Sequence, residues 1–131
     1  MTINKQKAIN KIHLEDTKVF IDIEIISKKT LKIPYKTFIK KLDKFLIKFT
    51  DPVEEIKEAC DLAFKKGFVI IAKFENKIVG FSILNKMNFK YFFPKYHLSY
   101  LAVNSDFKGH GLATLLLERA ILLSKPQFQV F

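Results

Sequence analysis

The sequence has one cysteine, Cys60, no tryptophan, and only four glycines and four prolines among its 131 residues. A single cysteine excludes a disulfide within the chain, so we expect a reducing, cytoplasmic location. No segment reaches the ~20 consecutive apolar residues of a membrane-spanning helix, and the N-terminal residues lack the apolar run of a secretion signal. One cysteine and three scattered histidines do not have the spacing of metal ligands, so we expect no bound metal.

Arginine is nearly absent, since Arg119 is the only one among the 23 basic residues that give the chain its net charge of +10. Proteins that read nucleic acids rely on arginine for bidentate contacts with phosphates and bases. The lysines are also spread along the whole chain, so nucleic acid is a disfavoured partner. The charge has two readings: a codon bias that enriches lysine, or a field that attracts an anionic ligand.

Apolar residues are abundant enough for a folded core, with 49% hydrophobic and 27% charged residues in a length that suits one domain. They alternate in some segments and recur every three to four residues in others, which predicts strands and helices respectively. Residues 1–18 fit either an arm or a short helix. The later elements are, in order, a strand at 19–26, helices at 35–49 and 50–67, a hairpin of strands 68–74 and 78–84, a strand at 97–103, a helix at 110–125 and a strand at 127–131.

This order predicts an α/β domain over residues 19–131, preceded by the N-terminal arm. Cys60 lies on the apolar stripe of the second helix, which favours a small core residue over a nucleophile. The helix at 110–125 is apolar on nearly all sides, so we expect it to be mostly buried.

Gly109 and Gly111 lie between a strand and that helix, where free backbone N–H groups and the positive end of a helix dipole favour phosphate binding. A Walker loop requires Gly-Lys-Ser/Thr at the helix start, whereas this chain has Gly-Leu-Ala. A Rossmann loop requires a third small residue, where Thr114 stands, and an acidic residue about twenty positions later, beyond the last residue. Both motifs therefore fit poorly.

The stretch "YLAVNSDFKGHGLATLLL", residues 100–117, resembles the pyrophosphate loop of the GNAT acetyltransferases. Lys108, Gly111 and Ala113 stand at the fixed positions of that family's motif, and the upstream order of elements is also similar over residues 19–131. The resemblance implies a mixed, mainly antiparallel sheet flanked by helices. It also implies a fold that lacks the family's usual C-terminal strand-helix-strand part, and a homodimer in which a partner covers the sheet edge left open.

Acetyl-CoA is the cosubstrate that the resemblance implies. The backbone of Leu101, Ala102 and Val103 would pair with the pantetheine arm. Lys108 replaces the family's Gln or Arg, which keeps the charge but loses the planar fork, so we expect weaker phosphate contact. The residues expected around the pyrophosphate are Lys108, Gly109, His110, Gly111, Leu112, Ala113 and Thr114.

The implied reaction is acetyl transfer to a primary amine, which requires a base for the amine and a proton for the departing thiolate. His97, six residues before Val103, is the candidate base, with ordered water as the alternative. The family's tyrosine acid has no counterpart, because Tyr91, Tyr96 and Tyr100 lie upstream of its position. The composition of the early helices and of residues 85–96 does not identify the acceptor.

Two other classes of function stay open. The chain is alternatively a non-catalytic remnant that binds CoA or self-associates. Less favoured is a basic nucleic-acid-binding protein, in which the aromatic and lysine residues of 88–96 stack on single-stranded bases.

Overall fold

The computed structural model describes residues 9–13, 19–44, 53–87 and 95–124. Within them, five strands form one sheet in the order β1-β2-β3-β4-β5, and every neighbouring pair is antiparallel. The elements are β1 (Ile9–His13), β2 (Phe20–Ile26), α1 (Tyr35–Asp43), α2 (Val53–Lys66), β3 (Gly67–Phe74), β4 (Lys77–Met87), β5 (Lys95–Val103), the short 3-10 helix η3 (Ser105–Phe107) and α3 (Leu112–Ser124).

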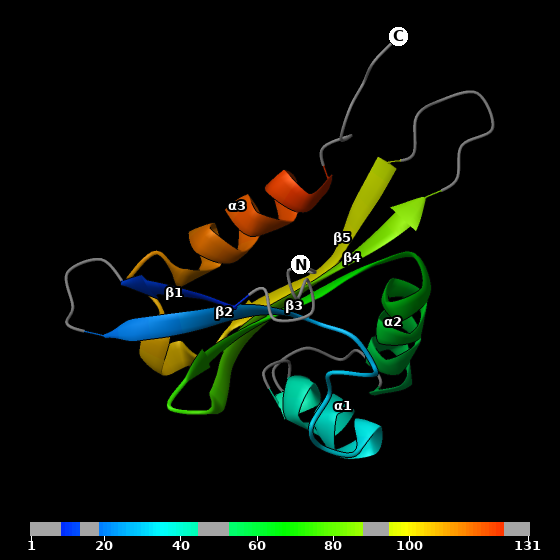
Figure 1. Ribbon diagram of the computed structural model, residues 1–131, viewed down its shortest axis with the longest axis horizontal. Helices are drawn as coiled ribbons and strands as arrows, with labels where there is room; N and C mark the ends of the chain where they lie inside the picture. Colours follow the sequence, from blue (N-terminus) through cyan, green and yellow to red (C-terminus); the bar gives the residue numbers. More distant parts are fainter. Residues whose placement is uncertain (1–8, 14–18, 45–52, 88–94, 125–131) are drawn as a thin grey trace, which may run out of the picture.

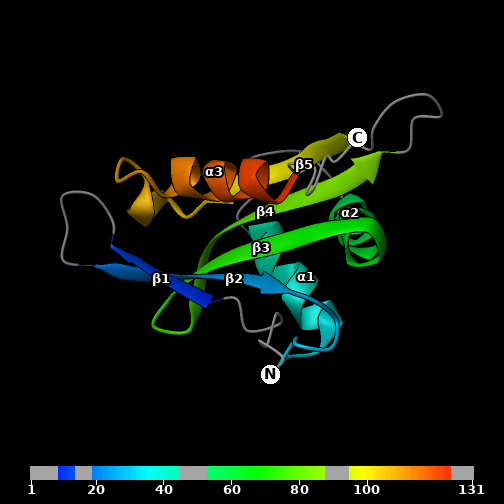
Figure 2. The ribbon, with the colours of Figure 1, turned by 45° about the horizontal axis from the view of Figure 1, so that its top comes forward.

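The sheet separates two helical layers, with α1 and α2 on one face and α3 on the other (Figures 1 and 2). This architecture confirms the predicted α/β class and the mainly antiparallel sheet. Strands β3 and β4 lie in the middle and are buried on both faces, as their nearly continuous apolar runs require. Strands β1 and β5 are the two edges of the described sheet.

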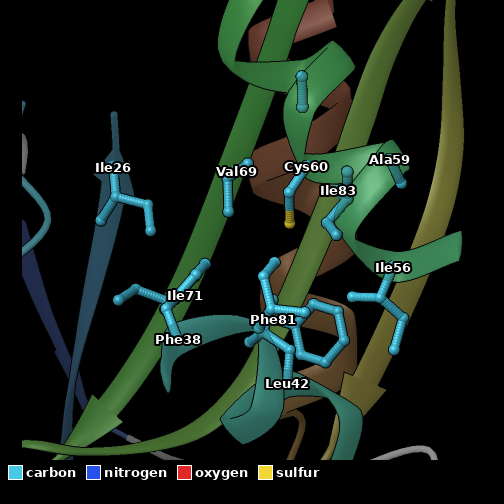
Figure 3. Close-up of a cluster of buried hydrophobic side chains, with 12 residues drawn as sticks. Ile26, Phe38, Leu42, Ile56, Ala59, Cys60, Val69, Ile71, Phe81 and Ile83 are labelled. Atoms are coloured by element: carbon cyan, nitrogen blue, oxygen red, sulfur yellow. The ribbon is translucent and has the colours of Figure 1, made fainter. Parts of the chain in front are cut away.

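Alternation along β3 divides its side chains between the two faces. Val69 and Ile71 belong to the core on the α1/α2 side, whereas Ile70 and Ala72 belong to the core under α3. Figure 3 shows the first of these cores, in which Cys60 lies among Val69, Ile83 and other apolar side chains. Cys60 is fully buried, which confirms its prediction as a core residue.

Helix α1 starts at Tyr35 as predicted, and α2 ends one residue before the predicted Gly67. The predicted helical residues 45–49 and 50–52 lie outside the described residues. Glu54 and Glu55 occupy the first turn of α2 and Lys65 and Lys66 its last turn, so the charges oppose the helix dipole at both ends. Gly67 then begins β3 directly, without an intervening loop.

Helix α3 differs from its expectation, because it buries one stripe and not most of its surface. Leu112, Leu116 and Ala120 are buried against the sheet. The opposite side is apolar and exposed, with exposed fractions of 39% for Leu117, 50% for Ile121 and 61% for Leu122.

Strand β1 was not foreseen, since an arm or a short helix was expected in residues 1–18. It pairs with β2 from Ile9 opposite Glu24 to His13 opposite Phe20, so pairing with an available strand edge decides the structure of this polar segment.

The turn of the hairpin between β3 and β4 is two residues long, and Glu75 and Asn76 both have positive φ, as a type I′ turn requires. The predicted strand at 127–131 lies outside the described residues.

No helix in the described ranges is long and apolar enough to cross a membrane. The same residues contain no group of three or more His, Cys, Asp or Glu side chains placed to hold a metal ion.

Replacing Gly67 by alanine is expected to destabilise the fold by about 3 kcal/mol, the upper end of overpacking effects. The new Cβ would overlap the Leu84 carbonyl and lie 3.2 Å from the Ala63 Cα, and backbone atoms cannot rotate away. The matched control is Gly109→Ala, whose Cβ meets nothing within 4 Å. Only its left-handed backbone opposes that change, at about 1 kcal/mol. Urea unfolding measures both variants, and an equal or larger loss at Gly109 would contradict the described joint between α2 and β3.

Candidate functional site

The conformation of the connection from β5 to α3 is fixed by hydrogen bonds at its start and by two glycines of positive φ near its end. Asn104 accepts a hydrogen bond through Oδ1 from the Asp106 N–H at 2.8 Å, and its own N–H donates to the Val79 carbonyl at 2.7 Å. These bonds fix the start of the connection to η3 and to the sheet. Gly109 and Gly111 then have φ values of 84° and 82°, which side chains with a Cβ rarely adopt.

Backbone hydrogen bonds are sparse in the glycine loop, defined here as residues 108–111, where the Lys108 N–H donates to the Ser105 carbonyl at 3.3 Å. Within the described residues, the N–H groups of Gly109, His110 and Gly111 make no backbone hydrogen bond. The first helical bond of α3 runs from the Leu115 N–H to the Gly111 carbonyl, so the N–H groups of the first turn also have no helical acceptor. No acidic residue lies in that turn to neutralise the positive end of the dipole. The arrangement suits an anion.

A cavity of about 480 Å³ lies beside this loop and the end of β5. Nine of the ten residues predicted to surround a cofactor line it; His110 does not, and Phe107 does in addition. Phe107 stacks on Phe74 with ring centroids 5.5 Å apart, a contact that its position in the sequence does not signal. The lining residues are Leu101, Ala102, Val103, Phe107, Lys108, Gly109, Gly111, Leu112, Ala113 and Thr114.

The cavity depends on a close approach between α3 and β4. A Cβ added at Gly80 would lie 3.0 Å from the Leu116 Cδ1 and 3.1 Å from the Ala102 carbonyl oxygen. Glycine at this position therefore lets α3 pack close to the sheet, with the first turn of the helix beside the end of β5.

A β-bulge interrupts the pairing of β4 with β5 before the cavity is reached. Tyr100 is opposite Ile83 and Leu98 is opposite Leu84, so Ser99 is an extra residue in β5. The Asn85 Nδ2 donates a hydrogen bond of 2.7 Å to the Ser99 Oγ and fixes this bulge.

Two polar atoms near the bulge are buried without a partner among the described residues, the Asn85 Oδ1 and the Ser82 Oγ. An unpaired buried oxygen costs about 1–3 kcal/mol, so such atoms are retained for a reason. Asn85 follows Phe81 and Ile83 on the face that carries α1 and α2, and its Oδ1 is a candidate acceptor for a ligand that enters from that face. Asn85 and Ser99 were not identified from sequence, because only the register of the two strands brings them together.

His97 lies opposite Asn85 in the β4–β5 register and is exposed. It does not line the cavity, whose first residue on β5 is Leu101. At the usual rise of a strand, four residues place His97 about 13 Å before Leu101. The structure thus separates the predicted base from the glycine loop and places it beside the bulge.

The Cys60 thiol is unreactive at neutral pH. Burial, with a smaller contribution from the Asp61 carboxylate, raises the pKa of its thiol to about 12. A thiol in this state is not a nucleophile at neutral pH.

Solved structures with the same fold provide the first comparison. A GNAT-family acetyltransferase from Staphylococcus aureus subsp. aureus USA300_TCH1516 matches with a TM-score of 0.58 and 18% identity over 79% of this chain and 77% of that one. A GNAT-family N-acetyltransferase from Escherichia coli, solved in complex with CoA, matches with a TM-score of 0.60 and 18% identity over 85% of this chain and 59% of that one.

A third structure is described as a glucosamine N-acetyltransferase region in a fungal multi-domain β-N-acetylglucosaminidase. It matches with a TM-score of 0.60 and 17% identity over 81% of this chain and 12% of that one. The chain thus spans less than two thirds of two of these three proteins. Identities this low establish a shared fold only.

A search of curated proteins returned no significant match. The sequence model of the acetyltransferase (GNAT) family, in contrast, matches residues 36–127, well over half of the chain. This match confirms the resemblance drawn from the glycine loop and the order of elements. The chain therefore belongs to the GNAT acetyltransferase family.

Proposed function

We propose that this protein binds acetyl-CoA and transfers its acetyl group to a primary amine. The observation that carries the proposal is the cavity beside the glycine loop, where N–H groups without acceptors meet the positive end of α3. An anionic pyrophosphate there would receive several hydrogen bonds at once. The solved CoA complex of a protein with the same fold supports this choice of ligand.

The rest of the cofactor would follow the strand. Leu101, Ala102 and Val103 line the cavity on the outer strand of the described sheet, so their backbone is available to pair with the pantetheine amides. A pantetheine chain that starts at the glycine loop and follows β5 would run back toward the Ser99 bulge. Its thioester end would then approach the face that carries Asn85 and His97.

The proposal includes a cellular location and a division of the chain into two parts. The buried, protonated thiol of Cys60 suits a reducing cytoplasm. The division into an arm at 1–18 and a CoA-binding unit at 19–131 stays a prediction, with β1 joined to the sheet from within the arm.

CoA binding is tested by thermal or chemical unfolding with CoA, acetyl-CoA, ATP and NAD. Acetyl-CoA at ~100 times its dissociation constant should stabilise the fold by ~2.7 kcal/mol, whereas ATP and NAD should have little effect. Lys108→Ala should weaken CoA binding about tenfold through loss of a cation beside the pyrophosphate. Lys66→Ala removes the same charge from an exposed site at the end of α2 and should change nothing. The absence of any shift at millimolar CoA would refute the proposal and its non-catalytic alternative together.

Catalysis is tested by thiol release from acetyl-CoA with small primary amines and with peptides that carry free amino groups. His97→Gln should lower kcat about 10²–10⁴-fold, with CoA affinity unchanged. The control is His13→Gln, since His13 is exposed on β1, where the centroid of its ring lies 4.9 Å from that of Phe20. Full activity of the His97 variant would assign the proton transfer to water. Intact CoA binding without thiol release from any amine would favour the non-catalytic remnant.

Self-association is the second part of the proposal. In Figure 1, α3 lies over the face of the sheet that ends at β5, an edge strand of the described sheet. The region proposed for self-association combines the exposed apolar side of α3 with the edge of β5 before Leu101. A second copy that covers it would leave Leu101–Val103 free for pantetheine.

The double variant Ile121→Glu/Leu122→Glu should convert a dimer to a monomer in sedimentation or light scattering, because both side chains are at least half exposed and apolar. Leu62→Glu on α2, with a comparable exposed fraction of 53%, should leave the dimer intact. A wild-type protein that is monomeric at tens of micromolar would count against the proposed dimer.

A further inference from the structure

The net positive charge of the protein is concentrated in one segment. Lysines are spread along the chain, but the acidic residues are not. Residues 27–44 hold seven lysines and one acidic residue, Asp43, so these 18 residues carry six of the ten net positive charges. The remaining 113 residues share the other four. The distribution of lysine alone conceals this imbalance.

All seven lysines are exposed. Lys28, Lys29 and Lys32 lie in the loop before α1. Lys36, Lys40, Lys41 and Lys44 lie on α1 or at its C-terminal cap, opposite the buried side chains of Phe38, Ile39 and Leu42. Figures 1 and 2 show α1 at the outside of the molecule, on the face of the sheet away from α3. We call this set of seven lysines the basic surface.

The basic surface continues into a shallow hollow at each end of α1. The hollow at its N-terminus has a volume of about 630 Å³ and includes Lys57 and Lys65 of α2 with Lys28 and Lys29. The hollow at its C-terminus, of about 360 Å³, is lined by Lys41, Lys44, Asn76, Lys77, Ile78 and Asn104. Cations therefore follow α1 along its whole length.

Three described carboxylates lie in or beside this surface: Asp43 on α1, Glu24 in a hollow that Lys32 and Lys41 also line, and Asp61. Glu24 pairs with Lys73, which is outside the basic surface. No ion pair within the described residues includes any of the seven lysines. Asp61, in the N-terminal hollow, accepts hydrogen bonds from the Tyr35 hydroxyl at 2.6 Å and from the Lys57 Nζ at 2.9 Å. Burial alone would raise the pKa of Asp61, but these two bonds and the nearby ammonium groups hold it below its usual value. The exposed carboxylates of Glu54, Glu55 and Glu58 lie on the first turns of α2 and line neither hollow.

The surface also lacks the features of a protein or membrane contact. Protein interfaces are anchored by aromatic residues, Met and Arg in a desolvated centre, and helices at a membrane surface insert apolar side chains. None of the large apolar side chains that are exposed in the described structure lies in residues 27–44. The aromatic rings of Tyr35 and Phe64 line only the N-terminal hollow, and neither is among the large exposed apolar side chains. A surface with many lysines and no large exposed apolar side chain suits phosphates.

We propose that the basic surface binds the phosphodiester backbone of nucleic acid without sequence preference. Lys36 and Lys44 are eight residues apart, so the α1 lysines extend over about 12 Å. This length corresponds to three or four phosphates of one DNA strand. Lysine supplies point charges for phosphates, and the absence of arginine is consistent with contacts that do not read bases.

This binding is independent of acetyl transfer and is measured without acetyl-CoA. Fluorescence anisotropy with a labelled 20-base-pair DNA duplex and a 20-nucleotide single strand gives the affinity at 50 and 200 mM KCl. Four phosphate contacts predict a slope of log K against log salt of about −3.6 for the duplex, which is a loss of about 100-fold in affinity over this range. Two duplexes of unrelated sequence should bind equally.

The double variant Lys36→Gln/Lys40→Gln should reduce the magnitude of the salt slope by about 2. The matched control, Lys66→Gln/Lys86→Gln, removes the same charge from exposed positions outside the basic surface and should leave the slope unchanged. Circular dichroism checks that both variants fold. The absence of binding at 50 mM KCl, or equal losses in the two variants, would overturn the proposal. Displacement by polyglutamate at equal charge concentration would overturn it in favour of an acidic protein.

Discussion

Burial of Leu112, Leu116 and Ala120 against the sheet is the contact on which the candidate site depends. It fixes the axis of α3 and thereby places the first turn of that helix next to the end of β5. The contact is possible because Gly80 has no side chain where Leu116 approaches β4. The glycine loop then has to cover a short distance with two residues of positive φ, and the N–H groups of Gly109, His110 and Gly111 make no backbone hydrogen bond within the described residues.

The elements of the fold could be predicted because each is specified by local pattern. The alternation in Ile21, Ile23 and Ile25 and the apolar runs of β3 and β4 specify strands wherever they pair. The cavity beside the glycine loop lies where the sequence predicts a cofactor, because Gly109 and Gly111 stand between a strand and a helix. In the proposed binding mode the contacts are made by backbone, so they depend little on other side chains.

Features that depend on pairing between distant segments could not be predicted. Ile9–His13 becomes a strand only because β2 offers an edge. The Asn85–Ser99 contact requires the register of β4 and β5 and the bulge between them, neither of which has a local signature. The exposed side of α3 was missed for the opposite reason, since its apolar residues look like core residues until the helix is seen to have one covered face.

Two anionic ligands are thus proposed for opposite faces of one sheet. On one side, α3 and the glycine loop offer oriented N–H groups to a compact pyrophosphate. On the other side, α1 offers mobile ammonium groups to an extended polyanion. Fixed dipoles give specificity for a defined ligand, whereas exposed lysines give salt-sensitive attraction.

The central claim is that the glycine loop holds the pyrophosphate of CoA through its backbone. Amide NMR with titration of unlabelled CoA tests this claim most directly, because each N–H reports its own hydrogen bond. The account predicts the largest shifts at Gly109–Thr114 and at Leu101–Val103, with small shifts in α1. Shifts confined to the lysines of residues 27–44, or no shifts at millimolar CoA, would contradict it.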